Sequence, residues 1–357
     1  MPLSTAKRAL ILIAALVCIA AAAGIYLYYR ARRPMPGPAP ASAANAAGGG
    51  AAIPSVSSVL GELPPGAPGV GYIDVAALRK LQNSPLAAML GLAGASPTSD
   101  KDYADFVRAT GFDYTRDLDK AAIAFWLDTA QPASDNPDVD RVVTIADGRF
   151  DQAKIKAYAL RTGKLVTHGS QSIYDVPGNP PTAFEFLSPT RILLASGKNA
   201  VNLLGPYTRR PRDPAVQALI DRVGAAPLFA VARTDNLPPT FYDYFRSYAQ
   251  LGQMARTVRG ITLAGEPDVS DLRLDLDAEC DSMTHALEMS TLLEGLRMVG
   301  SMALSDPKTR AEMTREQAAL LTALLSQAKI SHQDRWVRLT LDLTPSVLGE
   351  KVSSSKQ

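Results

Sequence analysis

Apolar positions divide the chain into a long uncharged segment near its start and a remainder in which short strands and helices alternate. Residues 9–29 carry no charge, and as a helix they span roughly 31 Å at 1.5 Å per residue. That length matches the hydrocarbon core of a bilayer. Basic residues flank the segment on both sides, namely Lys7, Arg8, Arg30, Arg32 and Arg33. We therefore predict that residues 1–33 form a transmembrane anchor, with the membrane as the partner of residues 9–29.

Two other interpretations of this segment remain open. A cleaved signal peptide also has a basic start, an apolar centre and small residues such as those at positions 20–23. The apolar run continues beyond them through Ile25 and Leu27, which favours an anchor that is not cleaved. Lipidation at Cys18 is disfavoured because Val17, and not a small residue, precedes the cysteine.

A linker rich in proline, alanine and glycine follows the anchor at residues 34–69, and Glu62 is its one charged residue. Such a composition is typical of a tether that holds a domain away from a surface. Because the basic residues on the two sides of the span nearly balance, the tether decides the predicted orientation. We expect a single-pass protein of the bacterial inner membrane, with its C-terminal region in the periplasm or otherwise outside the cytoplasm.

The next segment, residues 70–205, is predicted to form a first α/β half. Gly111 marks the end of one helix, because glycine is favoured just beyond a helix C-terminus. Expected strands are 71–75, 120–127, 141–146, 164–167, 183–187 and 191–195, and expected helices are 101–110 and 150–160.

A connector at residues 206–226 is expected to lead into a second half at 227–345, and residues 346–357 to form a disordered tail. Ser305 and Pro307 fit the cap and first turn of a helix. Expected strands are 228–232, 259–264, 271–277, 328–331 and 335–343, and expected helices are 240–254, 281–304 and 306–327.

The expected fold class is α+β, with two related halves of mainly antiparallel sheet covered by helices in a split β-α-β arrangement. Leu272, Leu274 and Leu276 alternate with charged residues, which is typical of a strand with one buried face. The two halves show the same order of elements, which indicates an internal repeat. A single irregular α+β domain is the alternative.

Charge changes this picture by excluding one class of partner. The chain has 37 basic and 35 acidic residues, and removing the five basic residues of the anchor flanks leaves 32 against 35. The region after the anchor is therefore close to neutral and lacks the basic surface that nucleic-acid binding requires. No nucleic-acid partner is expected.

Candidate chemistry in the chain is sparse, so we predict no catalytic residue, cofactor or metal site. The region after the anchor has one thiol, Cys280, and so cannot form an internal disulfide. His168, His285 and His332 are far apart and lack the spacing of a metal motif. Phosphate-binding and dinucleotide-binding glycine patterns are absent from the sequence.

Three short motifs match those of penicillin-binding proteins and serine β-lactamases, but in the wrong order. In those enzymes the S-x-x-K motif comes first, whereas here it comes last, at residues 305–308. The other two are residues 134–136 and 161–163, which fall in a polar loop and at a helix end. We interpret the match as coincidence.

Two groups of side chains are candidates for an interaction surface. An aromatic stretch carries Tyr242, Tyr244 and Tyr248, and tyrosines can stack on sugar rings or anchor an interface. Its helical spacing also fits a stripe packed into the core. A basic run could contact acidic lipid or polymer, and it consists of Arg209, Arg210 and Arg212.

The stretches GYIDVAAL and FVRATGFDYTRDLDKAAIAF, together with the anchor and linker, resemble uncharacterised exported, membrane-anchored bacterial α/β proteins. The resemblance covers most of the region after the anchor, and it implies an envelope location without an assigned activity. We expect an extracytoplasmic module that binds an envelope protein or polymer without catalysis. The alternatives are a membrane-tethered hydrolase with an unrecognised site and a ligand carrier with a cleft between the halves.

Overall fold

The fold is that of a computed structural model of the chain. It describes residues 59–80, 101–127, 139–168, 171–178, 180–197, 199–204, 212–235, 249–267, 271–307, 309 and 315–343. These residues fall into two compact units, each of which is treated by itself. The N-terminal unit contains the described residues up to position 235, and the C-terminal unit contains those from position 249 onward.

The N-terminal unit is built on a sheet with the strand order β8-β1-β2-β3-β7-β6-β5-β4. Each pair of neighbouring strands in it is antiparallel. Its strands are β1 (Gly69–Asp74), β2 (Leu118–Leu127), β3 (Val139–Gly148), β4 (Lys164–His168), β5 (Gln171–Val176), β6 (Thr182–Ser188), β7 (Arg191–Gly197) and β8 (Leu228–Arg233).

Aromatic side chains fill the space between this sheet and two of its helices, α5 (Lys101–Thr110) and α7 (Gln152–Ala159). Phe106 of α5 meets Tyr158 of α7 edge to face, with ring centroids 5.4 Å apart. Phe150 stacks on Phe112 and contacts Phe186 of β6. The core of this unit therefore forms under helices on one part of the sheet, as the apolar spacing of α5 and α7 requires. The remaining helices are α3 (Val75–Lys80), α6 (Tyr114–Asp117), η1 (Ala200–Leu204) and α8 (Pro214–Val223).

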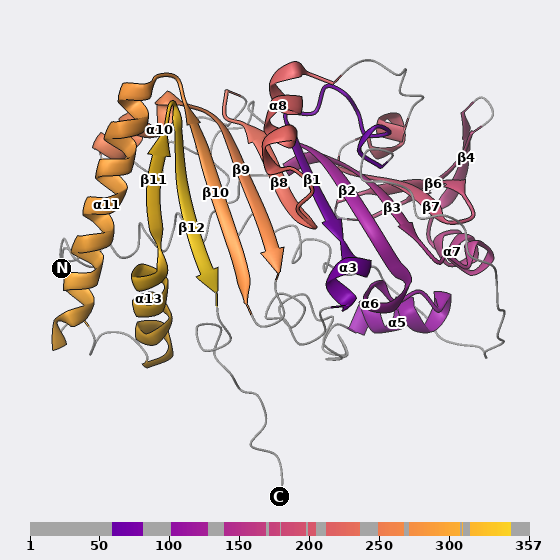
Figure 1. The fold of residues 1–357 in the computed structure, drawn as a ribbon. Helices are drawn as coiled ribbons and strands as arrows, with labels where there is room; N and C mark the ends of the chain where they lie inside the picture. The colour runs from indigo at the N-terminus through magenta and orange to yellow at the C-terminus, as the bar shows by residue number, and fades with distance from the viewer. Residues whose placement is uncertain are drawn as a thin grey trace, which may run out of the picture. The chain divides into compact units, whose positions relative to one another are not determined.

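The C-terminal unit has a smaller antiparallel sheet with the order β11-β12-β10-β9. Its helix α11 runs lengthwise beside β11, as Figure 1 shows. A buried cluster joins this helix to one face of the sheet through Met289, Cys280 and Val337. The strands are β9 (Val258–Pro267), β10 (Leu272–Cys280), β11 (Lys329–Gln333) and β12 (Trp336–Leu343), and the helices are α10 (Ala249–Thr257), α11 (Met283–Ser305) and α13 (Arg315–Gln327).

Polar side chains occupy the opposite face of the smaller sheet. Asp277 of β10 lies opposite Arg338 of β12 and accepts two hydrogen bonds from its guanidinium, at 2.7 and 2.8 Å. Two register positions along, on the same face, Thr340 donates to Asp275 at 2.6 Å. The leucines of β10 face the other way, since successive side chains of a strand alternate between faces. The α+β class with antiparallel sheets is thus confirmed.

The two sheets share one topological feature. In the N-terminal unit, the hairpin β2–β3 is followed by α7, and the chain later returns so that β7 pairs with β3. In the C-terminal unit, the hairpin β9–β10 is followed by α11, and β12 returns to pair with β10. In each unit the strand that closes the segment therefore lies inside the sheet, next to the second strand of the hairpin.

Within residues 206–226, which were predicted as a connector, helix α8 begins at Pro214, behind the Asp213 cap that accepts from Ala215 N. One predicted detail is wrong. Ser305 does not cap the following helix but is the last residue of α11, where its hydroxyl donates to Ser301 O at 3.0 Å.

Other predictions concern residues outside the described part of the chain. These are the anchor at 9–29, most of the 34–69 linker and the tail at 346–357. No helix within the described residues is both long and apolar enough to cross a bilayer.

Candidate interaction site on helix α11

The start of α11 is fixed by a hydrogen bond that the local sequence provides. Ser282 is the N-cap, with extended backbone angles, and its hydroxyl accepts from His285 N at 3.2 Å. The cap satisfies one of the amide groups that a helix start leaves without a partner. Asp281 precedes the cap, and its amide donates to Thr257 O at 2.8 Å. The start of α11 is thereby held against the end of α10, where β9 begins.

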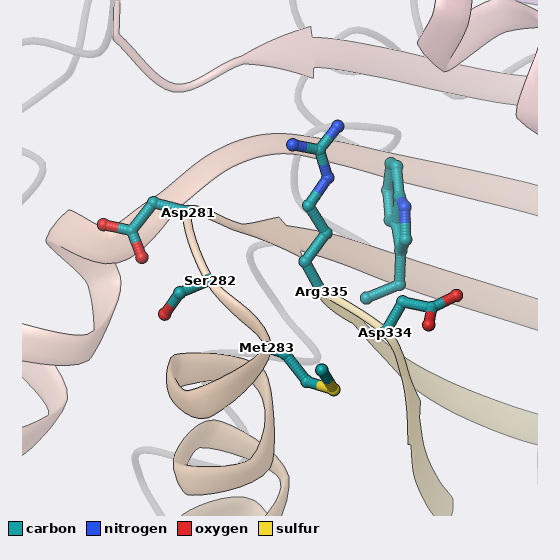
Figure 2. A pocket seen from close by; sticks show the side chains of 6 residues that line it. Asp281, Ser282, Met283, Asp334 and Arg335 are labelled. Atoms are coloured by element: carbon teal, nitrogen blue, oxygen red, sulfur yellow. The ribbon is translucent and has the colours of Figure 1, made fainter.

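A shallow, open depression of about 450 Å³ lies beside this first turn. Figure 2 shows Asp281, Ser282 and Met283 on the helix side and Asp334 and Arg335 on the side of the β11–β12 turn. Met283 extends from the helix toward the hairpin. The lining of the depression includes two carboxylates and one guanidinium. The depression is also open to solvent, unlike the enclosed, mostly apolar pockets that hold small ligands. The depression is therefore better suited to lie at the rim of a protein–protein contact than to bind a small molecule.

Two of the three charged side chains that line the depression, Asp281 and Arg335, are paired. Asp281 lies 2.5 Å from His285 Nδ1 and 3.5 Å from Arg259. The hydrogen bond to Asp281 raises the pKa of His285, and the same bond lowers the pKa of Asp281. Arg335 reaches Glu279 at 2.8 Å. Asp281 and Arg335 are therefore stabilised by partners within the chain, and neither is free to bind a charged ligand.

The outer face of α11 is apolar and exposed. Met283, Leu287, Met298 and Met302 are exposed to 64%, 50%, 55% and 72% of their surface. At 100° per residue their positions fall within about a third of the helix circumference, so they form one stripe. We call these four side chains the α11 stripe. The opposite side of the helix packs inward through Ala286, Met289 and Leu304.

Between Leu287 and Met298 the same face carries Thr291 and Glu294, and Gly295 lies at its edge. Nothing comes within 4 Å of the position that a Cβ would occupy at Gly295. Nearby, Glu294 is bound by Arg297 through contacts of 2.6 and 3.0 Å. The centre of the face is thus polar, and its one carboxylate has its cation on the same helix.

Ser290 and His332 form a contact that resembles part of a hydrolase site. Ser290 Oγ lies 3.1 Å from His332 Nδ1, which joins α11 to β11. The hydroxyl also donates to Leu287 O at 2.9 Å, so its proton is directed at a carbonyl instead of a base. Ser290 is 7% exposed, which leaves almost no path for a substrate. The geometry is that of a packed helical serine and lacks the features of an activated nucleophile.

Most of the residues predicted for an interaction surface fall outside the described part of the chain. These are Tyr242, Tyr244, Tyr248, Arg209 and Arg210. Arg212 is described, and its guanidinium donates to Leu60 O at 2.5 Å. Burial lowers the pKa of Arg212, so it is a half-buried side chain that packs within its own unit. It does not present a free charge to an acidic polymer.

Two other side chains discussed above as candidates for chemistry, Cys280 and Arg161, have structural roles. Burial raises the pKa of the Cys280 thiol, which is fully enclosed in the cluster under α11. Arg161, from the coincidental penicillin-type motifs, lies over the Tyr158 ring at 4.1 Å from its centroid. Within the described part of the chain, no group of histidine, cysteine and acidic side chains is placed to hold a metal ion.

The α11 stripe was not predicted from the sequence. Residues 283–305 contain leucine, methionine, valine or alanine on every side of the helix, including Leu292, Leu293 and Leu296. With apolar residues all round, helical spacing cannot separate the face that packs on the sheet from the face that points outward. The concentration of methionine toward one side was the available signal, because methionine is common at adaptable binding surfaces.

Comparisons with known proteins add no identity. The sequence matches no protein-family model and no curated protein. Among solved structures, crystal form III of TP0453 aligns with a TM-score of 0.44 and 11% identity over 81% of this chain and 94% of that chain. Crystal form I gives 0.42 and 10% over 81% and 94%, and form IV gives 0.42 and 12% over 79% and 92%. These likenesses are too low to support an argument about function.

Proposed function

We propose that this protein is a membrane-anchored, extracytoplasmic module that binds a partner without catalysing a reaction, and that the α11 stripe is its binding surface. The observation that carries the proposal is the exposure of four large apolar side chains on one helix face. Large apolar side chains that gather on one exposed face, unlike single scattered ones, mark sites of interaction. The anchor at residues 9–29 and the linker after it would hold this surface outside the membrane.

The contacts around the stripe support binding over chemistry. Asp281, His285 and Arg335 are engaged in pairs at the depression beside Met283. Ser290, which contacts His332, is itself buried, and its hydroxyl donates to Leu287 O. By contrast, the methionines of the stripe are flexible and polarisable, which suits a surface that must fit another apolar face.

The test replaces Met302 of the full-length chain with a photo-reactive residue. The variant is expressed in the membrane of the cells that normally make the protein. We expect irradiation to give a discrete covalent adduct with a macromolecule at this position. The matched control is the same photo-reactive residue at Leu165, which is 49% exposed on β4 of the other unit and should give no such adduct. If Met302 gives no adduct, or if the two positions give the same products, the proposed surface is wrong.

We further infer that the two units arose as related halves of one repeat. The common arrangement of a hairpin, a helix and a returning strand next to the second hairpin strand supports this inference. Superposition of β2, β3 and β7 on β9, β10 and β12 in a crystal structure should match all three strands in order and direction. A mismatch in direction would show that the likeness arose independently.

A further inference from the structure

The α11 stripe has a symmetric spacing along its helix. Met283 and Leu287 are one helical turn apart, and so are Met298 and Met302. Met283 and Met302 have the same sequence midpoint as Leu287 and Met298, namely the bond between Leu292 and Leu293. The spacing of the apolar side chains is therefore the same from either end of the stripe, although Leu287 corresponds to Met298.

A face with this symmetry is complementary to its own copy. When two such helices lie antiparallel about a twofold axis at that midpoint, Met283 faces Met302 of the copy and Leu287 faces Met298 of the copy. A twofold interface has this reciprocal form, in which one residue contacts a second and the second contacts the first across the axis. Each apolar side chain of the stripe then meets an apolar side chain.

The middle and the edge of the face also allow a second helix to pack. Nothing lies within 4 Å of the Cβ position of Gly295 at the edge of the face, so a neighbouring helix can come close there. Glu294, near the same point, is bound by Arg297 on its own helix, so bringing two copies together does not leave two free carboxylates opposed. An antiparallel arrangement also places the positive start of each helix beside the negative end of the other.

Charge argues against a lipid surface as the occupant. Helices that lie in a membrane interface carry many lysine or arginine side chains on their polar face. In α11 the charged side chains other than histidine are Glu288, Glu294 and Arg297, and Arg297 is paired with Glu294. The helix thus offers no excess positive charge to anionic headgroups.

We propose that the partner of the α11 stripe is a second copy of this chain, paired antiparallel through α11. This inference rests on the proposed function, because it names the occupant of the same binding surface. A single pair of helices buries less than the roughly 1,200 Å² that stable complexes reach. The dimer is therefore expected to be weak and to depend on protein concentration.

The main experiment uses full-length chains in detergent with Cys18→Ser, while Cys280 is retained because it is fully buried. One chain carries Leu287→Cys, and a second chain with a size tag carries Met298→Cys. Mild oxidation of the mixture should give a disulfide-linked heterodimer. Neither chain alone should be cross-linked, because copies of the same position are about 16 Å apart along the antiparallel helices.

A second pair of variants tests the contact without a cross-link. Leu287→Glu and Met298→Lys, made singly, should each lower the dimer association constant about tenfold by burying an unpaired charge. A chain that carries both substitutions should recover dimerisation, because the introduced carboxylate of one copy would face the introduced ammonium group of the other. Sedimentation over a range of protein concentrations measures the three association constants. A double variant that associates no better than either single variant would contradict the antiparallel register.

The outcomes separate the two proposals. Cross-linking of Leu287→Cys with itself would indicate parallel pairing and overturn the antiparallel inference. The absence of any cross-link, together with a photo-adduct of different mass at Met302, would overturn the second copy as partner and leave the binding function standing. Loss of both the cross-link and the photo-adduct would overturn the inference and the proposed function together.

Discussion

At the residue scale, the pair of Asp281 and His285 sets how the start of α11 responds to pH. Asp281 raises the pKa of His285 through their hydrogen bond. We expect Asp281→Asn to lower the pKa of His285 toward its ordinary value of about 6.5. A proton NMR titration of the imidazole signals, assigned with His285→Gln, measures this change. An unchanged His285 pKa in Asp281→Asn would contradict the contact.

The sign of the pH dependence follows from the two shifts. The pKa of His285 is raised, so its contribution to stability is complete below the unfolded value and is lost as pH rises through the folded value. The pKa of Asp281 is lowered, so its contribution is lost as pH falls through the folded value. The helix start is therefore stabilised most strongly between those two limits.

The ion pair of Arg338 and Asp277 allows a direct test of how much one buried pair contributes to stability. The Asp277 side chain is 4% exposed, and Arg338 is its partner through two hydrogen bonds. We expect Arg338→Ala to lower the free energy of unfolding by roughly 2–3 kcal/mol, because it leaves a buried carboxylate without its cation. Urea denaturation of the solubilised chain measures the loss. Arg335→Ala is the matched control: its pair with Glu279 is more exposed, and it should cost less than about 1 kcal/mol.

Some of this residue-scale detail is visible in the sequence and some is not. The alternation of Leu272, Leu274 and Leu276 with charged residues correctly predicts the two faces of β10. The same alternation makes Asp277 look like a solvated charge, whereas it is buried. Its partner Arg338 is 61 positions away, and spacing along a strand carries no information about such a distant neighbour.

At the scale of elements, the turn after α7 depends on one glycine. A Cβ at Gly163 would lie 2.9 Å from Ala159 O and even closer to Asp175 O. We expect Gly163→Ala to lower the free energy of unfolding by about 1–3 kcal/mol, since neither carbonyl belongs to a side chain that can move away. Gly66→Ala is the control, because nothing lies within 4 Å of its Cβ position. Equal denaturation midpoints for the two variants would contradict this prediction.

Whether a segment is a helix or a strand was easier to predict than which of its faces is buried. Helix α5 has the predicted bounds of 101–110, and Gly111 adopts the positive φ of 76° expected of a glycine beyond a helix end. Strand β5 (Gln171–Val176) was not predicted, because apolar and polar residues do not alternate clearly along it. For α11 the helix was predicted, but the exposed stripe was not, because packing against β11 and β12 decides which apolar side is covered.

At the scale of the whole molecule, the position of the chain relative to the membrane can be tested directly. Alkaline phosphatase fused after Gly61 should be active in a bacterial host, because the uncharged linker is expected to emerge outside the cytoplasm. A cytoplasmic reporter at the same site should be inactive. The reverse pattern of activities would place the two units inside the cell and exclude the proposed extracytoplasmic role.

The class of the whole molecule was within reach of the sequence, whereas its sheet order was not. Strands separated by short turns, such as β11 and β12, predict their own antiparallel pairing. The pairing of β7 with β3 joins segments with a helix and further strands between them. Such pairing is decided by tertiary packing, and the local pattern of neither strand contains it.

The inner position of β12 has a consequence for how the chain is made. β12 pairs with β10 on one side and β11 on the other, yet it is later in the chain than both. During synthesis, β10 therefore keeps an unpaired edge until residues 336–343 have left the ribosome. An open edge of this kind is a template for pairing with other chains. Ribosomes that stall or terminate just before Trp336 would release a product prone to aggregation, whereas termination just after Leu343 would release a chain in which β10 can pair on both sides.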